Sequence, residues 1–376
     1  MFLKKVFNTI LLLGITSATL AIPPSTLRVA VIGSEAIRTT IDTPNYKKAY
    51  VDGFTVAIDK FKKENIKIDL KYFNYGSNPL NIFKAVDAAK QWDPSLIVGP
   101  KNSNEFLLIK QSFKHTLVIS TFANAFSLKQ LPDNYYTLTP KESRFAATSA
   151  NYLLKKYPKK GAFIIVERGC RSCIDFSNAF SATYLKAKRP SATHYFLSSN
   201  ITQLDPQGLL NGYQKGDIIV LSSTANNAFI LIVELLSTLN YPITFIGDDN
   251  WGVKIAAQVN KIPALRNNFT ALRFSTWSLD GKSLLLKQFK RNYMIVFHQG
   301  PAYTISFANY KIIASVIAAL KRNHALHPGL ISAKSVEESY LKAREKSPHW
   351  FQEDSVSVFK THGDQTENYM TAIKVL

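Results

Sequence analysis

Residues 27–33 read LRVAVIG and predict a β-strand that runs into a loop. The next segment, 46–64, carries small or aromatic residues at every fourth position, which is the spacing of one helix face. These positions are Ala49, Gly53, Ala57 and Phe61. A strand followed by such a helix is the repeating unit of α/β proteins, so the start of the chain predicts a parallel sheet with helices packed on it.

The same alternation continues through most of the chain. Further strands of a first unit are expected at 66–73, 96–98 and 117–120, with helices that open at Pro79 and at Asn102 or Ser103. After a short strand at 135–138 the pattern begins again, with helices near 145–154, 176–185 and 226–239 and strands at 162–167, 194–197, 217–222 and 244–247. The sequence therefore predicts an α/β fold with two Rossmann-like lobes, each built on a parallel central sheet.

The C-terminal part departs from this order. Helices are expected at 281–293, 303–322 and 335–346, and two strands follow at 355–359 and 370–375. Those strands need a sheet to join, so we expect several crossings between the lobes, a hinge, and a ligand cleft at the carboxyl ends of the strands. The expected lobes are 22–139 with about 275–347, and 140–274 with about 348–376.

The first 21 residues predict a cleaved secretory signal peptide. Lys4 and Lys5 form a basic start, an apolar run follows at 10–13, and Thr19 and Ala21 supply small residues before the expected cleavage point. We exclude this segment from the fold and expect the mature protein in the periplasm.

Composition narrows the class of protein further. The chain has 376 residues, 46% hydrophobic and 19% charged, with a formal net charge of +20, which excludes disordered and collagen-like classes. A basic balance often indicates nucleic-acid binding, but export and the scattered lysine pairs favour a solvated surface, so we expect no nucleic-acid partner. The apolar runs 225–233 and 312–320 are too short to span a bilayer and predict buried helices.

Common enzyme signatures are missing from the sequence. There is no GxSxG and no GxGxxG, so we expect a protein that is not an enzyme and has neither catalytic residues nor a cofactor. His324 and His327 lie close together but have no third ligand beside them, so no metal site is expected there.

Cys170 and Cys173 are the two cysteines of the chain and form a Cys-x-x-Cys motif. In an exported protein this spacing predicts a small local disulfide. The alternative is thiol exchange, for which the positive charges of Arg168 and Arg171 would favour a thiolate.

Polar residues stand where the expected strands end or the expected helices begin. In or next to the first lobe they are Ser103, Ser120, Thr121, Asn124 and Ser143. Hydroxyl groups and helix N-terminal amides suit a ligand carboxylate, and the alternative for each residue is an ordinary helix cap. In the second lobe, Asp248, Asp249 and Asn250 follow a strand, where a carboxylate would meet a ligand ammonium group unless it caps a helix.

Five segments together carry a resemblance to a known family. They are RVAVIGS (28–34), GFTVAID (53–59), SLIVGPKNS (95–103), VISTFAN (118–124) and FIGDDNWG (245–252). In this order the chain resembles the type I periplasmic binding proteins of bacterial ABC importers, in particular the leucine/isoleucine/valine-binding branch. The resemblance implies two lobes, joined by three crossings, that close around a small ligand.

The resemblance also implies positions for the ligand. It puts Ser103 and the segment 121–124, which includes Ala123, at the ligand carboxylate and Asp249 near its amino group. The chain departs from the family where the segment 170–173 replaces an expected aromatic residue, and where Asn74 and Tyr75 replace a common acidic residue.

We therefore expect a periplasmic solute-binding protein that delivers an amino acid or related polar small molecule to an ABC permease in the inner membrane. Two alternatives stay open. One is a periplasmic regulator of an envelope enzyme that keeps the same fold, and the other is a thiol oxidoreductase that uses Cys170 and Cys173.

Overall fold

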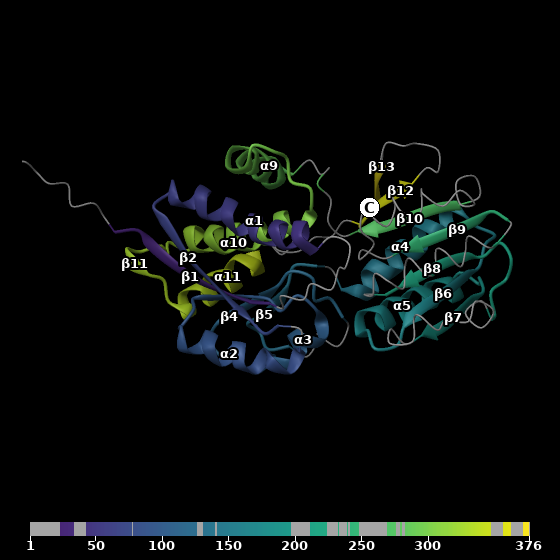
Figure 1. Ribbon diagram of the computed structural model, residues 1–376, viewed down its shortest axis with the longest axis horizontal. Helices are drawn as coiled ribbons and strands as arrows, with labels where there is room; N and C mark the ends of the chain where they lie inside the picture. Colours follow the sequence, from purple (N-terminus) through teal and green to yellow (C-terminus); the bar gives the residue numbers. More distant parts are fainter. Residues whose placement is uncertain are drawn as a thin grey trace, which may run out of the picture.

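A computed structural model shows two α/β lobes, one coloured from purple to blue with yellow-green helices and the other from teal to green (Figure 1). It describes residues 23–33, 43–76, 78–125, 131–139, 141–196, 211–223, 232, 239, 241–247, 269–275, 279, 283–346, 356–361 and 371–375. Within these ranges no helix is long and apolar enough to cross a membrane.

The sheet of lobe 1 is parallel throughout. Its strands are β1 (Ser25–Gly33), β2 (Ile66–Asn74), β3 (Leu96–Val98), β4 (Leu117–Ser120), β5 (Tyr135–Thr137) and β11 (Gly329–Leu330). β1 pairs with β2 along its whole length and with β11 and then β3 on its other side, and β4 and β5 follow β3. The helices between these strands are α1 (Thr43–Lys62), the 3-10 turn Pro79–Asn81, α2 (Ile82–Gln91) and α3 (Ser103–Leu108).

Three helices from the C-terminal part complete lobe 1. They are α9 (Leu284–Phe297), α10 (Thr304–Arg322) and α11 (Ala333–Lys346). Because α10 packs against α1, α9 and α11, its residues 305–317 are all buried. The α1–α10 approach depends on Gly53, where an added Cβ would lie 2.1 Å from the backbone oxygen of Ser306.

The sheet of lobe 2 is parallel except at its C-terminal strands. Its members are β6 (Ala162–Glu167), β7 (Ser191–Phe196), β8 (Ile218–Ser222), β9 (Ile243–Gly247), β10 (Phe269–Ser275), β12 (Val356–Thr361) and β13 (Thr371–Val375). The order is β13-β12-β10-β9-β8-β6-β7, and β12 and β13 join antiparallel. The two C-terminal strands therefore join a sheet, as the sequence analysis expected. β12 pairs with β10, a strand that the sequence analysis did not predict.

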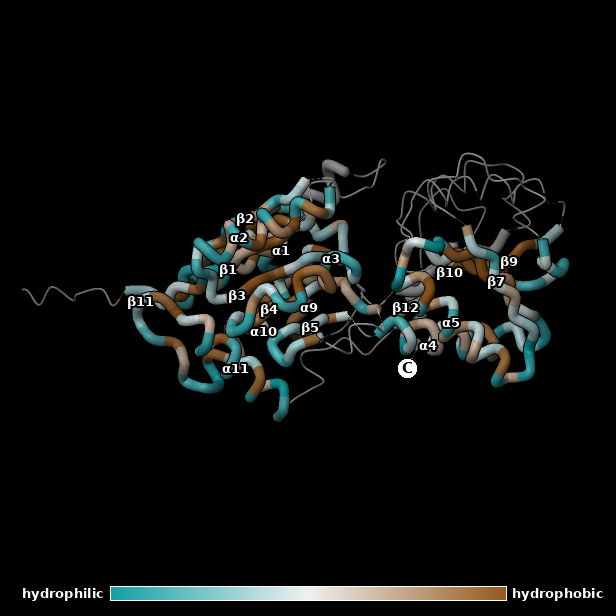
Figure 2. The backbone as a smooth tube through the Cα atoms, turned by 90° about the horizontal axis from the view of Figure 1, so that it is seen from below, coloured by the Kyte–Doolittle hydropathy of each residue, from teal (hydrophilic) through white to brown (hydrophobic). Residues whose placement is uncertain are grey.

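Two helices of lobe 2 are described, α4 (Glu142–Lys156) and α5 (Arg171–Lys186), and they pack together. Phe176, Phe180 and Tyr184 form a stacked row along α5, and Phe145 of α4 packs against Phe176 at 5.8 Å between ring centroids. The predicted helix 226–239 lies outside the described residues, apart from Ile232 and Leu239. In Figure 2 the tube around β3 and β9 is brown, in keeping with the apolar sequences of these buried strands.

The two sheets share one topology. In lobe 1 the second strand, β2, lies on one side of β1 and the third, fourth and fifth lie on the other; in lobe 2, β7 and then β8, β9 and β10 surround β6 in the same way. The predicted fold class, two α/β lobes with largely parallel sheets, is confirmed.

Candidate functional site

Open α/β sheets with this strand order bind ligands at the carboxyl ends of their strands. The binding point lies between the two neighbouring strands from which the chain continues in opposite directions along the sheet. That point lies between β1 and β3 in lobe 1 and between β6 and β8 in lobe 2. In Figure 1, β1 starts at the end of lobe 1 far from lobe 2, and the arrows of β9 and β10 point toward lobe 1. The carboxyl ends of both sheets therefore point toward the junction of the lobes, where residues of α3 and α5 come close.

Ser103 joins two loops at this edge of lobe 1. Its side chain is buried, and its Oγ accepts hydrogen bonds from the backbone amides of Asn124 at 3.1 Å and Ala125 at 3.2 Å. The cap of α3 is instead Asn102, whose Oδ1 accepts from the amide of Glu105 at 3.0 Å. Ser103 thus fixes the loop after β4 against the start of α3.

Thr121 and Ala123 belong to the same loop but point into lobe 1. The hydroxyl of Thr121 donates to Oδ1 of Asn309 at 3.0 Å, and Nδ2 of Asn309 donates to the backbone oxygen of Tyr50 at 2.9 Å. Ala123 is fully buried, and its amide donates to Oγ of Ser120 at 3.1 Å. These contacts give the loop one conformation.

Asn124 connects this loop to the first helix of lobe 2. Its backbone oxygen accepts a hydrogen bond from the amide of Glu142, the first residue of α4, at 2.9 Å. Ser143 is the next residue of α4 and is half-buried. The structure therefore brings Ser103 and Asn124 together and puts Ser143 beside the residue that Asn124 contacts.

The residues after β2 add a polar group that the sequence analysis noted only as a departure from the family. Tyr75 is buried, and both burial and a hydrogen bond to the Glu105 carboxylate raise its pKa well above the usual value. Asn74 accepts from the amide of Gly76 at 2.8 Å and so shapes the turn after the strand. Tyr75 and α3 are thereby linked at the same edge.

In lobe 2 the position between β6 and β8 holds a buried carboxylate. Glu167 ends β6 with 8% of its surface exposed, and its Oε2 accepts a hydrogen bond at 2.9 Å from the hydroxyl of Ser223, which follows β8. The sequence analysis missed both residues. An acidic residue at the end of an otherwise apolar strand was the available signal, but its partner lies 56 residues further along the chain.

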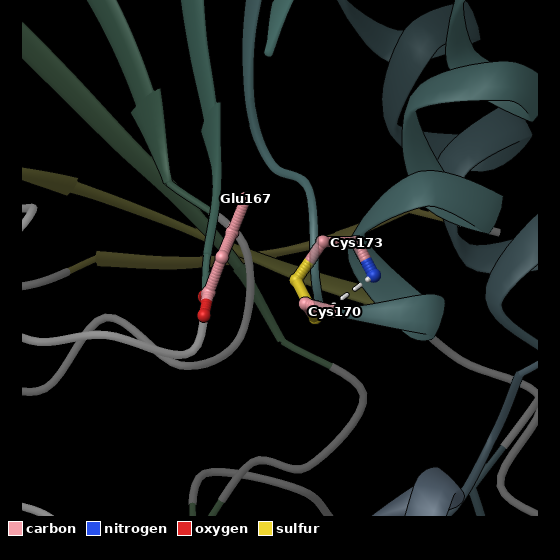
Figure 3. A group of neighbouring side chains, drawn as sticks. All are labelled: Glu167, Cys170 and Cys173. Atoms are coloured by element: carbon pink, nitrogen blue, oxygen red, sulfur yellow. Dashed lines mark hydrogen bonds between the residues drawn. A yellow bond between two sulfur atoms is a disulfide. The ribbon is translucent and has the colours of Figure 1, made fainter. Parts of the chain in front are cut away.

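The predicted disulfide is present beside this carboxylate. Cys170 Sγ and Cys173 Sγ are 1.99 Å apart, and a carboxylate oxygen of Glu167 and the two sulfurs all lie within 4.8 Å of one another (Figure 3). Because each sulfur is bonded to the other, neither is the thiolate that a metal ion would require. The group is therefore a disulfide next to a carboxylate.

Asp249 was the predicted partner of a ligand amino group. It lies outside the described residues, as do Asp248 and Asn250, and β9 ends at Gly247 directly before them.

Comparison of the chain with profiles of known protein families and with curated protein sequences gives no match. Among solved structures it is similar to a leucine-binding protein, LivK, from Thermotoga maritima, with a TM-score of 0.72, 14% identity, and coverage of 93% of this chain and 98% of that one. It is also similar to LivJ, a branched-chain amino acid transporter substrate-binding protein from Streptococcus pneumoniae in complex with isoleucine. There the TM-score is 0.70 at 15% identity, covering 93% of this chain and 100% of that one.

A third similar structure is an ABC transporter substrate-binding protein from Desulfitobacterium hafniense in complex with leucine. Its TM-score is 0.70 at 12% identity, with 93% of this chain and 100% of that one covered. The similarity extends over both lobes in all three cases. The chain therefore has the fold of the type I periplasmic binding proteins.

Proposed function

We propose that this chain is a periplasmic solute-binding protein that holds an amino acid or a related polar small molecule between its two lobes. It would act without catalysing a reaction and would deliver the ligand to an ABC permease in the inner membrane. The observation that carries the proposal is the meeting of two sheets, whose five central strands follow the same order, at their carboxyl ends, in a fold shared with proteins described as complexes with leucine and isoleucine.

The chemistry of the two edges supports a zwitterionic ligand. Lobe 1 offers the start of α3 and the loop after β4, with Ser103 and Asn124 at their contact. Lobe 2 offers the carboxylate of Glu167, joined to Ser223, and we propose that Asp249 adds a second one. A ligand whose carboxylate and ammonium groups are held by opposite lobes favours closure, because it contacts both lobes only in the closed state.

The proposed lobe boundaries are those expected from the sequence, 22–139 with about 275–347 and 140–274 with about 348–376. The segment 1–21 would direct export and then be removed. N-terminal sequencing of the mature protein tests this step: a chain that begins near Ile22 supports it, whereas full-length chain in the cytoplasm contradicts the assigned compartment.

The ligand is sought by native mass spectrometry of the mature protein purified from its own periplasm. A bound small molecule is expected to add its mass to the protein, and it identifies the probe for calorimetry. Asp249→Asn should weaken its binding by about 1.5 to 3 kcal/mol, roughly ten- to a hundred-fold, because a charge-assisted hydrogen bond is lost. Asp248→Asn is the matched control and should bind nearly as well as the natural chain.

Two outcomes count against the proposal. A large loss in Asp248→Asn with no change in Asp249→Asn would assign the ammonium contact to Asp248. If no small molecule is found bound and none shifts the melting temperature, the regulator of an envelope enzyme becomes the better reading of the fold.

A further inference from the structure

The disulfide stands at the start of a long helix. Cys170 is the N-cap of α5, whose 16 residues run from Arg171 to Lys186. Its Sγ accepts a hydrogen bond from the amide of Cys173 at 3.2 Å, and the hydroxyl of Ser172 lies 3.4 Å from the same sulfur. These contacts would stabilise negative charge on Cys170 when the disulfide opens, because hydrogen bonds to a charged acceptor are stronger than those to a neutral one.

The helix N-terminus and two arginines around Cys170 act in the same direction, whereas the carboxylate of Glu167, within 4.8 Å of the sulfur, acts against them. The helix has no acidic residue in its first turn, so the partial positive charge of its N-terminus is not offset there. Arg168 and Arg171 flank the cysteine and are exposed. A helix N-terminus and nearby arginines are the features that lower the pKa of a cysteine thiol.

The two sulfurs differ in access. Cys170 follows Gly169, which is exposed and has no other atom within 4 Å of the position of a Cβ, and Cys170 itself retains 6% of its surface. Cys173 retains 2%, and both cysteines belong to the apolar cluster that includes Phe145 and Phe176. Of the two buried cysteines, Cys170 is therefore the more accessible to an attacking group of small size.

We infer that Cys170–Cys173 is a redox centre that exchanges with low-molecular-weight thiols, with Cys170 as the sulfur that is attacked. A small thiolate forms a bond to Cys170 Sγ, the Cys170–Cys173 bond breaks, and the electron pair leaves on Cys173 Sγ, which takes a proton from solvent. A second small thiolate attacks the sulfur of the bound molecule and releases Cys170 as a thiolate. Two small thiols are thereby oxidised to one disulfide, and the protein disulfide is reduced by two electrons.

Glu167 lies where it can assist the reverse reaction, in which the protein disulfide forms again. When the small thiol is still bound to Cys170, Cys173 must lose its proton before it can displace that molecule and restore the disulfide. The carboxylate of Glu167 lies within 4.8 Å of both sulfurs and is held at 2.9 Å by Ser223. We assign Glu167 the role of proton acceptor for Cys173.

The first experiment equilibrates the mature protein with mixtures of glutathione and glutathione disulfide and counts reduced cysteines by alkylation and mass spectrometry. The expected result is a change from oxidised to reduced protein within the range of these mixtures, since a stabilised thiolate makes a disulfide easier to reduce. A protein that stays oxidised in excess glutathione would show that the disulfide is only structural and would overturn the inference. Loss of the amino-acid ligand leaves this measurement unaffected, so the two proposals fail separately.

Single variants test which sulfur reacts. Cys173→Ser should form a mixed disulfide with glutathione, and its Cys170 thiol should have a pKa below the ordinary value of about 8.5. Cys170→Ser should react at least ten-fold more slowly, because Cys173 is the less exposed of the two and is not the N-cap of α5. Equal rates, or a Cys170 pKa at or above the ordinary value, would contradict the inference. If a single variant does not fold, the site of adduct formation in the natural chain, trapped at low pH, gives the same information.

Charge variants separate the local effects from general ones. Arg171→Ala should raise the Cys170 pKa, whereas Lys186→Ala, which removes an exposed positive charge from the far end of the same helix, should not. Glu167→Gln should slow closure of the mixed disulfide at neutral pH by at least ten-fold and shift its pH profile upward, and Asp175→Asn on the same helix is its control. Unchanged closure in Glu167→Gln would remove the role assigned to that carboxylate.

Discussion

The five central strands follow the same order in the two sheets, but the residues at their carboxyl ends have very different chemistry. In lobe 1 these polar residues at the edge are engaged within the lobe: Ser103 accepts from two backbone amides, and Thr121 donates to the side chain of Asn309. In lobe 2 the edge holds a buried carboxylate, Glu167, beside a disulfide. One topology thus supports a hydrogen-bonded scaffold on one side of the junction and a charged, redox-sensitive group on the other.

The difference shows that a polar residue at a strand end is not automatically a ligand contact. Hydroxyl groups that satisfy buried amides determine the shape of a loop, and they affect binding through that shape. A carboxylate at a strand end instead contributes charge directly. The following variants test this difference between hydroxyl groups that shape a loop and carboxylates that contribute charge.

The largest change in the free energy of unfolding is expected when the Ser103 hydroxyl is removed. Ser103→Ala leaves the amides of Asn124 and Ala125 without their acceptor, and it should lower the free energy of unfolding by about 3 kcal/mol, since each buried unsatisfied amide costs about 1–3 kcal/mol. Chemical denaturation of the mature protein measures it. Ser143→Ala, at a half-buried position, is the control and should change stability by less than about 0.5 kcal/mol. Equal effects would mean that Ser103 does not hold the loop.

A smaller change in the free energy of unfolding is expected when the hydroxyl of Thr121 is removed. Thr121→Val keeps the shape of the side chain but takes away the donor to the fully buried Asn309, so unfolding should become easier by about 2 kcal/mol. Thr148→Val, on a partly exposed face of α4, serves for comparison, because its hydroxyl contacts only the backbone of its own helix. A Thr121→Val variant as stable as the natural chain would show that the Asn309 contact contributes nothing.

For lobe 2 the corresponding test is removal of the disulfide. Cys170→Ser/Cys173→Ser opens a very short loop, so the cost in unfolding free energy should be about 1–2 kcal/mol, mainly from the added freedom of the unfolded chain. Ligand binding should remain largely intact. If binding disappears while circular dichroism shows a folded protein, the loop itself forms part of the binding site.

The smallest expected effect is a pH dependence of opposite sign in the two lobes. Burial raises the pKa of Glu64, but hydrogen bonds and charges from Lys321 and Lys60 outweigh it and leave the pKa below its usual 4.5. Stability from this group is therefore complete above pH 4.5 and is lost as the pH falls further. In lobe 2, burial raises the pKa of Asp217 above its usual 3.8, so protonation on acidification relieves a cost.

Denaturation between pH 6 and about pH 3 should detect these contributions, each within about 0.5 kcal/mol. Relative to the natural chain, Glu64→Gln should flatten the loss of stability on acidification, and Asp217→Asn should make that loss steeper. The same direction of change in both variants would contradict the assigned shifts.

Much of the fold could be predicted because helices and strands are encoded by neighbouring residues. The strand at 27–33 and the helix marked by Ala49, Gly53, Ala57 and Phe61 are present as β1 and α1. The start of α5 was predicted too late, at Phe176 instead of Arg171, because the cap is a cysteine and the first turn lacks an apolar period. β10 was missed for a related reason: FTALRFS mixes polar and apolar residues, and no clear turn residues mark its ends.

The candidate site was only partly predictable. The sequence indicated Ser103, Asn124 and the cysteine pair, because hydroxyl and amide residues after a strand, and a Cys-x-x-Cys in an exported chain, are local signals. It did not indicate the bond between Glu167 and Ser223, or that between Thr121 and Asn309, whose partners are 56 and 188 residues apart. The sequence by itself determined the order of helices and strands and the class of fold, since periodicity is a property of adjacent residues. Only the tertiary structure decided which polar groups meet, because strand order and helix packing bring distant residues to the same edge and bury them there.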